Sequence, residues 1–349
     1  MENLKILKIS FFLWVFVYSS ASINGMSHRM WHIESQASGN IQIKINGMTV
    51  WNAVCYGDIN ILSKSEYNPN IKNLQGRTAL SRAIKRQNRE VVETLLQKGA
   101  NPNLADDDGD LPLSRASCEG YIDIVRLLLA HGADAAVYDA SGRSALSLAA
   151  GNNRPDIVAT LLARGAIVII NKADAKGRTP LSWASGFGNT EVVKLLLDSG
   201  ARIDIYDNYR QTPLMKATGH GHLELVKLFI EKSSNSALNY QDDGGKTALI
   251  WATMHGHKNI VKLLIEHGAD VNIKNISKQT ALHKALFLSE DLPKNKLSEK
   301  SEIIRLLIEA GADSNVADTH GNIPRKLAKG SKYAEIIDHW AWVARLITE

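Results

Sequence analysis

A short signature recurs through almost the whole of this 349-residue chain. Each copy reads Thr, Ser or Leu, then Ala or Pro, then Leu, at residues 78–80, 111–113, 144–146, 179–181, 212–214, 247–249 and 280–282. Consecutive copies are 33, 33, 35, 33, 35 and 33 residues apart. A period in this range predicts stacked supersecondary units in place of one globular core, and it favours binding over catalysis.

Residues 174–205 illustrate how the sequence specifies one unit. Gly177 suits the positive φ of a tight turn, while Thr179 and Pro180 suit the N-cap and first position of a short helix. A second helix follows, and Gly200 ends it at a left-handed C′ position. Its apolar stripe consists of Val192, Val193, Leu196 and Leu197. One unit cannot bury this stripe alone, so it must stack on copies of itself.

These units resemble the ankyrin repeat, which has a turn, a Thr-Pro-Leu-His-like helix start, two antiparallel helices and a Gly-Ala-Asp-Val-Asn-like ending. Residues 268–272 match that ending in full, and the resemblance spans residues 48–345. It implies an all-α ankyrin-repeat α-solenoid with short β-turn tips. The usual His stands only at His283. Because that His normally bonds neighbouring turns, its absence elsewhere implies more loosely held turns.

Segments that depart from the repeat pattern indicate how the chain is divided. In order, they are a signal peptide (1–22), a linker (23–47), an N-terminal capping repeat (48–72), seven ankyrin repeats (73–317) and a C-terminal capping repeat (318–349). The linker includes an alternating stretch that favours a β-hairpin, and the N-terminal cap has a truncated second helix. Short insertions near residues 169–170 and 233–238 should lengthen surface loops. A longer one, at about 288–298, should protrude between the two helices of the seventh repeat.

The N-terminus has the features of a secretory signal peptide. Lys5 and Lys8 precede an apolar run at 9–18, and small residues follow at 19–22. The run is shorter than the roughly 20 apolar residues that span a bilayer. We therefore expect a secreted or periplasmic protein. An uncleaved anchor that holds the chain at a membrane, or a buried N-terminal helix, are the alternatives.

Composition and motifs argue against several function classes. The net charge of +5 is spread evenly, whereas nucleic-acid binding favours a concentrated basic stripe. Cys55 and Cys118 lie two repeats apart, which places them about 20 Å from each other, so we expect free thiols. A nucleophile elbow, a phosphate loop and a redox cysteine pair are all missing from the sequence. We expect neither an enzyme nor a cofactor nor a small-molecule substrate.

Metal binding is an alternative activity. His220, His222, His255 and His257 flank glycines in the turns between helices of two adjacent repeats, and four histidines can hold zinc. The ankyrin pattern itself carries a Gly-His at this turn, which accounts for His222 and His257. The sequence also offers no obvious carboxylate ligand. We therefore predict no metal ligands.

Binding to a protein partner is the function that the resemblance implies, because ankyrin-like stacks use their concave surface for this purpose. The middle of that surface is rich in aromatic, Met and basic residues, a composition typical of interface anchors. The candidates are Arg178, Trp183, Phe187, Tyr209, His220, Lys246, Trp251, Met254 and His255. For Trp183 and Trp251, partial burial between neighbouring first helices is an equally good interpretation.

A second candidate surface lies near the first repeats and is basic. It consists of Arg77, Arg82, Lys85, Arg86 and Arg115, which suit an acidic partner.

Our leading hypothesis is that the protein is an exported, monomeric, non-catalytic scaffold that binds a macromolecular partner on its concave face. An effector role fits by resemblance to ankyrin proteins of host-associated bacteria. A membrane-anchored structural tether is the alternative.

Overall fold

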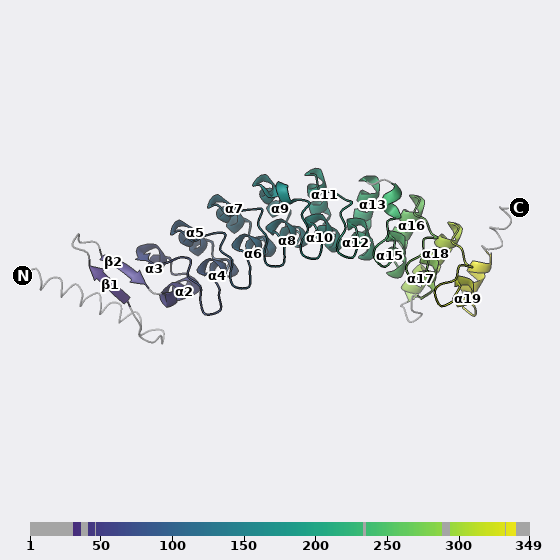
Figure 1. Ribbon diagram of the computed structural model, residues 1–349, viewed down its shortest axis with the longest axis horizontal. Coiled ribbons are helices and arrows are strands. Elements are labelled where there is room, and N and C mark those ends of the chain that lie inside the picture. The colour runs from purple at the N-terminus through teal and green to yellow at the C-terminus, as the bar shows by residue number, and fades with distance from the viewer. Residues whose placement is uncertain are drawn as a thin grey trace, which may run out of the picture.

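The protein is an elongated, curved stack of helical pairs (Figure 1). The computed structural model describes residues 31–35, 41–45, 47–232, 235–287, 294–331 and 333–339. The first helices of the pairs form one row and the second helices form another, and the turn tips extend from the first-helix row on the inner side of the curve. The predicted all-α solenoid is confirmed.

Seven repeats make up the body of the stack, and each contributes two helices. The first helices are α4 (Ala79–Lys85), α6 (Pro112–Glu119), α8 (Ala145–Gly151), α10 (Pro180–Phe187), α12 (Pro213–Gly219), α15 (Ala248–Met254) and α17 (Ala281–Phe287). The second helices are α5 (Arg89–Gln97), α7 (Ile122–Ala130), α9 (Pro155–Ala163), α11 (Thr190–Asp198), α13 (Leu223–Lys232), α16 (Lys258–Glu266) and α18 (Lys294–Glu309).

The helix ends follow the sequence signals in the fourth repeat. The Thr179 hydroxyl accepts the Ser182 backbone N–H at 3.2 Å, and Pro180 occupies the first turn of α10. Gly177 has φ +77° and Gly200 has φ +94°, both in the left-handed region that favours glycine. The residues predicted to form the turn and to start and end the helices of this repeat therefore do so.

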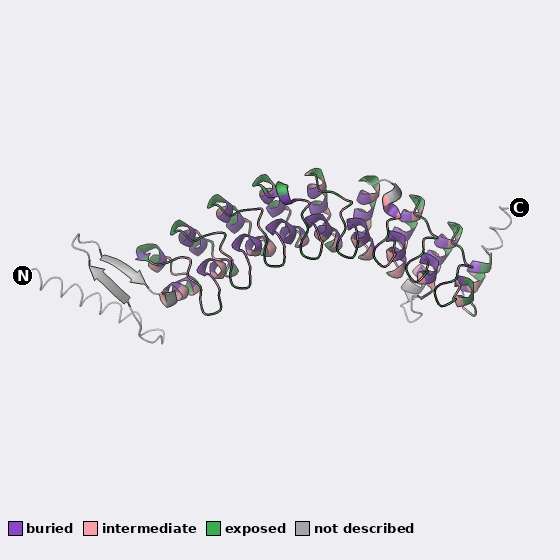
Figure 2. Ribbon diagram, viewed as in Figure 1, coloured by how far each residue is buried: buried purple, intermediate pink, exposed green. Residues whose placement is uncertain are grey.

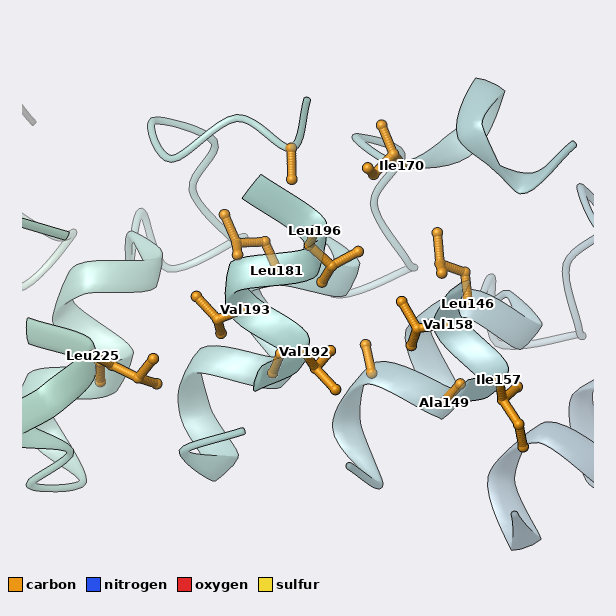
Figure 3. Close-up of a cluster of buried hydrophobic side chains, with 14 of the residues drawn as sticks. Leu146, Ala149, Ile157, Val158, Ile170, Leu181, Val192, Val193, Leu196 and Leu225 are labelled. Atoms are coloured by element: carbon orange, nitrogen blue, oxygen red, sulfur yellow. The ribbon is translucent and has the colours of Figure 1, made fainter. Parts of the chain in front are cut away.

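One hydrophobic core runs along the array between the two helix rows (Figure 2). Val192, Val193 and Leu196 are 0% exposed. Figure 3 shows these side chains of the fourth repeat with Leu146 and Val158 of the third and Leu225 of the fifth. Because neighbouring repeats share this core, the stability of each repeat depends on the repeats beside it.

Two sets of hydrogen bonds join neighbouring repeats outside the core. At the turn tips, a backbone N–H bonds the carbonyl of the preceding tip, as in Asn208 to Lys176 and Asp243 to Tyr209, each at 3.0 Å. Behind the second helices, asparagines bridge successive Gly-Ala endings: the Asn103 amide donates to Gly132 O, and its oxygen accepts the Asp134 N–H. These bonds fix the spacing of repeats independently of apolar packing.

His283 provides a further link, as its sequence position predicts. Its imidazole is 0% exposed, Nδ1 accepts the Thr280 N–H, and Nε2 donates to Asn322 O in the next turn at 3.2 Å. By contrast, the hydroxyls of Ser114 and Ser182 at the equivalent position make no hydrogen bond to any described residue. Most other turns rely on the backbone bond between tips.

The N-terminal end of the stack combines helices with a small sheet. α2 (Gly47–Tyr56) and α3 (Ile59–Lys64) form a helical pair whose second helix has six residues. Strand β1 (Trp31–Ser35) pairs antiparallel with β2 (Ile41–Ile45), and β2 pairs parallel with β3 (Ser65–Glu66). None of the helices in the described ranges has the length and apolarity needed to cross a membrane. The predicted signal peptide, 1–22, lies outside the described residues.

The insertions differ from the predicted loops. Two short helices lie at these places, η1 (Ala166–Ile169) and α14 (Asn235–Leu238), and Ile169, Ile170 and Leu238 are buried. Residues 233–234 lie outside the described ranges. In the seventh repeat α18 begins at Lys294, so part of the predicted 288–298 insertion is helical. Residues 288–293 lie outside the described ranges.

The C-terminal end consists of α19 (Pro324–Leu327) and a helical segment at 333–339. Tyr333 and Ile337 of that segment are buried against the array. Residues 340–349 of the predicted C-terminal capping repeat lie outside the described residues.

Cys55 and Cys118 are free cysteines, as expected from their separation.

Two turn tips have a basic residue at the position where most other tips have a glycine with positive φ. Arg210 and Lys278 both have φ +56°, a conformation that costs an L-residue roughly 1–2 kcal/mol. The Arg210 guanidinium lies 5.6 and 5.3 Å from the rings of Tyr206 and Tyr240 and donates to the Tyr240 hydroxyl at 2.8 Å. Lys278 is exposed and makes no such side-chain contacts with the described residues.

We therefore expect Lys278→Gly to raise the free energy of unfolding by about 0.5–1 kcal/mol, since relief of strain exceeds the added chain entropy. Arg210→Gly should give no gain, because it also removes the cation–π and hydrogen-bond contacts. Urea unfolding followed by circular dichroism measures both. Equal stabilisation of the two variants would show that the Arg210 contacts contribute nothing.

Candidate protein-interaction face

The nine predicted binding residues lie in the fourth to sixth repeats, on the first-helix row and its turns. We call this set, Arg178, Trp183, Phe187, Tyr209, His220, Lys246, Trp251, Met254 and His255, the concave-face patch. Phe187 and Tyr209 are 61% and 65% exposed, and His220 and His255 are also exposed. The other five are half-buried.

Trp183 is held in a fixed orientation by its own turn. Its indole Nε1 donates to the buried Asp174 carboxylate at 3.1 Å, and the Arg178 guanidinium lies 3.8 Å from the ring centroid. Arg178 Nε also donates to Asp174, at 2.9 Å. Burial tends to raise the pKa of Asp174, but hydrogen bonds from Arg178 and from the Lys176 backbone hold that pKa below its ordinary value.

The sixth repeat contains the same arrangement. Trp251 Nε1 donates to the buried Asp242 carboxylate at 3.0 Å, and the Lys246 ammonium lies 4.4 Å from the Trp251 ring centroid. Neither Asp174 nor Asp242 was identified from the sequence as part of the patch. The sequence signal that could have identified this pair is an Asp five residues before the helix N-cap together with a Trp four residues after that N-cap.

Both tryptophans pack against a glycine of the preceding first helix. A Cβ added at Gly151 would lie 3.0 Å from Trp183, and one added at Gly219 would lie 3.4 Å from Trp251. The rings are thus half-buried between neighbouring first helices, as the second interpretation of the sequence proposed. We call Trp183 and Trp251 the tryptophan platforms.

Each platform supports a more exposed ring one helical turn further on. Trp183 and Phe187 are stacked with centroids 6.0 Å apart, and Trp251 and His255 are stacked at 5.7 Å. Partial burial lowers the pKa of His255, and the nearby His220 and Lys246 lower it further, so the neutral form of the ring is favoured at pH 7. Phe187, His220 and His255 occupy the same position in three consecutive repeats and form one row.

The fifth repeat replaces the tryptophan with a cation. Lys216 stands at the position of Trp183 and Trp251, and its ammonium lies 2.7 Å from the buried Asp207 carboxylate. Tyr209 lies at the tip of the same turn, where its ring is largely free of protein contact. Along the row of first helices, an ion-paired lysine in the fifth repeat therefore separates the tryptophans of the fourth and sixth repeats.

The four turn histidines do not converge on a metal position. His222 Nε2 lies 3.1 Å from Gly186 O and His257 Nε2 lies 3.2 Å from Gly219 O, so both rings bond the preceding repeat. His220 Nδ1 lies 2.9 Å from Lys216 O. Among the described residues, no group of three or more His, Cys, Asp or Glu side chains is arranged to hold a metal ion. The geometry gives the metal alternative no support.

An open stack of two-helix units with exposed aromatic side chains on its inner side is the architecture of a helical repeat protein. The family model for ankyrin repeats (three copies) matches residues 50–139, 131–207, 200–275 and 236–318, so the chain belongs to the ankyrin repeat family. Ankyrin repeats are generally protein–protein interaction modules and are typically not enzymes.

A solved structure supports the same fold. The chain is similar to the human ASB11 ankyrin repeat domain, with a TM-score of 0.56 and 24% sequence identity, over 66% of this chain and 98% of that chain. No curated protein sequence matches the chain significantly.

The platform interpretation predicts different effects for two neighbouring aromatic residues. Trp183→Ala should lower the free energy of unfolding by about 2 kcal/mol, because it removes a half-buried ring and an Asp174 hydrogen bond. Phe187→Ala, on the same helix but exposed, should change stability by less than about 0.5 kcal/mol. Urea titrations of both proteins provide the comparison. Wild-type stability in Trp183→Ala would mean that Trp183 is not a structural platform.

Proposed function

We propose that this protein is a non-catalytic scaffold that binds a protein partner on the concave-face patch. The observation that carries the proposal is the row formed by Phe187, His220 and His255. These exposed rings stand at the C-terminal ends of the first helices, and two of them stack on a tryptophan platform. Rigid aromatic groups lose little conformational entropy on binding and are enriched among residues that dominate binding energy.

The charges around the patch favour apolar contact with the partner over ionic contact. Asp174 neutralises Arg178, Asp207 neutralises Lys216, and the neutral form of His255 is favoured at pH 7. Lys246 is the basic residue of the patch for which the described residues provide no ion pair. A suitable partner segment carries apolar or aromatic side chains, with at most a local negative charge near the sixth repeat.

A quantitative capture experiment tests the proposal. The full array is used as bait in an extract of its source, and the captured proteins are compared between wild type and Phe187→Ala/Tyr209→Ala/His255→Ala. The control is Ile167→Ala/Val168→Ala, which removes exposed apolar side chains on η1, away from the first-helix row. We expect at least a tenfold loss of a captured protein with the patch variant alone. Equal capture by both variants would contradict the proposal.

We also propose that the chain is exported after removal of residues 1–22, and that it acts as a monomer on a partner outside the producing cytoplasm, as an effector would. The support is the basic, apolar and small-residue order of the N-terminus. N-terminal sequencing of the exported protein is the test. A mature chain starting near Ile23 is expected, whereas an intact Met1 in a membrane fraction would favour the anchored tether.

A further inference from the structure

The first repeat carries four basic residues on its turn and first helix, which we call the first-repeat basic cluster: Arg77, Arg82, Lys85 and Arg86. Arg82 and Arg86 are four residues apart on α4 and its C-cap, and Lys85 lies three residues after Arg82. Side chains at these spacings share one face of a helix. Like charges in this arrangement repel each other, so the cluster reduces the stability of its own helix.

The cluster is not neutralised within the protein. In later repeats a basic residue at the equivalent positions meets a turn carboxylate, as in Arg143 with Asp139 and Lys216 with Asp207, both at 2.7 Å. In the first repeat the turn carboxylate is replaced by Asn73, whose oxygen accepts the Gln75 and Arg77 backbone N–H groups.

Within the described ranges, none of the four basic side chains forms an ion pair or a side-chain hydrogen bond. Arg82 Nε is buried from solvent and has no acceptor. An unpaired buried donor of this kind destabilises the protein, and the Arg82 charge is left without a carboxylate partner among the described residues.

The neighbours of the cluster limit what it can bind. Arg115, which the sequence placed on the same surface, is paired with Asp110 and therefore does not contribute a free charge. Asp108 and Glu119 of the second repeat are acidic and have no ion pair in the described structure. A long phosphodiester chain running along the concave side would meet these carboxylates, so a short acidic segment fits better.

An aromatic residue lies on the other side of the cluster. Tyr56 ends α2, is 72% exposed, and holds in the capping unit the position that Arg86 holds in the first repeat. α2 packs beside α4 in the stack (Figure 1). The surface therefore offers positive charge next to an exposed ring, bounded by acidic residues.

We propose that the first-repeat basic cluster and Tyr56 dock a short, extended acidic segment of a partner protein. The carboxylates of the segment pair with Arg82, Lys85 and Arg86, and an apolar side chain of the segment packs on Tyr56. This surface is three repeats away from the concave-face patch, so it can act as a second contact for the same partner and increase avidity.

Fluorescence anisotropy with a labelled ten-residue peptide of Glu and Asp with one Phe tests this proposal on the full chain. We expect saturable binding that weakens as NaCl rises. Lys85→Glu/Arg86→Glu should raise the dissociation constant at least tenfold. Arg126→Glu/Lys194→Glu, an equal charge change at exposed second-helix positions, should raise it less than twofold. Circular dichroism establishes that each variant is folded, and Lys85→Gln/Arg86→Gln replaces the first variant if it is not.

Three outcomes would overturn the proposal. The first is no saturable binding of the peptide to wild type, and the second is an equal loss of affinity in the cluster and control variants. The third is tighter binding of a ten-nucleotide single-stranded DNA than of the peptide, with loss of DNA binding in the cluster variant, which would assign the surface to nucleic acid. The Phe187, Tyr209 and His255 triple variant should bind the peptide normally, so this result is independent of the concave-face patch.

Discussion

Leu196→Asp is expected to lower the free energy of unfolding by at least about 4 kcal/mol. Leu196 is 0% exposed in the core shared by the third, fourth and fifth repeats. The substitution removes a buried apolar side chain and places a carboxylate in a hydrophobic core. Because each repeat is stabilised by its neighbours, the loss should spread over several repeats.

Hydrogen exchange measured by mass spectrometry shows where this loss falls. Amides of the third to fifth repeats should exchange much faster in Leu196→Asp, while those of the first and seventh repeats should change little. Lys194→Asp is the matched control, since Lys194 is exposed two residues away on the same helix. Uniform destabilisation from end to end would contradict a nearest-neighbour stack.

Gly177→Val is expected to lower the free energy of unfolding by about 3 kcal/mol. A Cβ at this position would lie 2.6 Å from Asn208 N and 2.9 Å from the Asp207 carbonyl carbon, both backbone atoms that cannot move aside freely. The residue also has φ +77°, which a β-branched side chain tolerates poorly. The change should break the bond from Asn208 N–H to Lys176 O that joins two turn tips.

Gly200→Ala separates these two causes. Gly200 has φ +94° but nothing within 4 Å of an added Cβ, so this variant should lose only about 1 kcal/mol from backbone strain. Thermal and urea unfolding of both variants give the comparison. Equal losses in the two proteins would mean that close approach of the turn tips has no role in stability.

The repeat architecture could be predicted from the sequence because its determinants are local. Thr179 and Pro180 start a helix, Gly200 ends one, and the stripe of Val192 and Leu196 has helical spacing. The residues of the two-residue insertion could not be placed in this way. Ile169 and Ile170, at the end of a short helix, turn inward because they are apolar, a tertiary effect that loop length alone does not reveal.

The candidate site was predicted only in part. Composition located the aromatic residues, but it could not divide them into platforms and exposed rings. That division depends on Asp174 and Asp242, which hold the indoles, and on Gly151 and Gly219, which admit them. The basic cluster was visible in the sequence as well. The positive charges of the cluster stay without an ion-pair partner for two reasons. Asn73 replaces the turn carboxylate, and the fold brings no other described carboxylate within reach of these side chains.

The central claim is that the partner binds the inner, first-helix side of the stack, and site-specific photocrosslinking tests it most directly. Benzoylphenylalanine is placed at Phe187 in one protein and at Lys194, on the second helix of the same repeat, in another. After irradiation with the captured partner, we expect a covalent adduct from position 187 and none from position 194. An adduct from position 194 alone would place the partner on the outer side and contradict binding at the first-helix side.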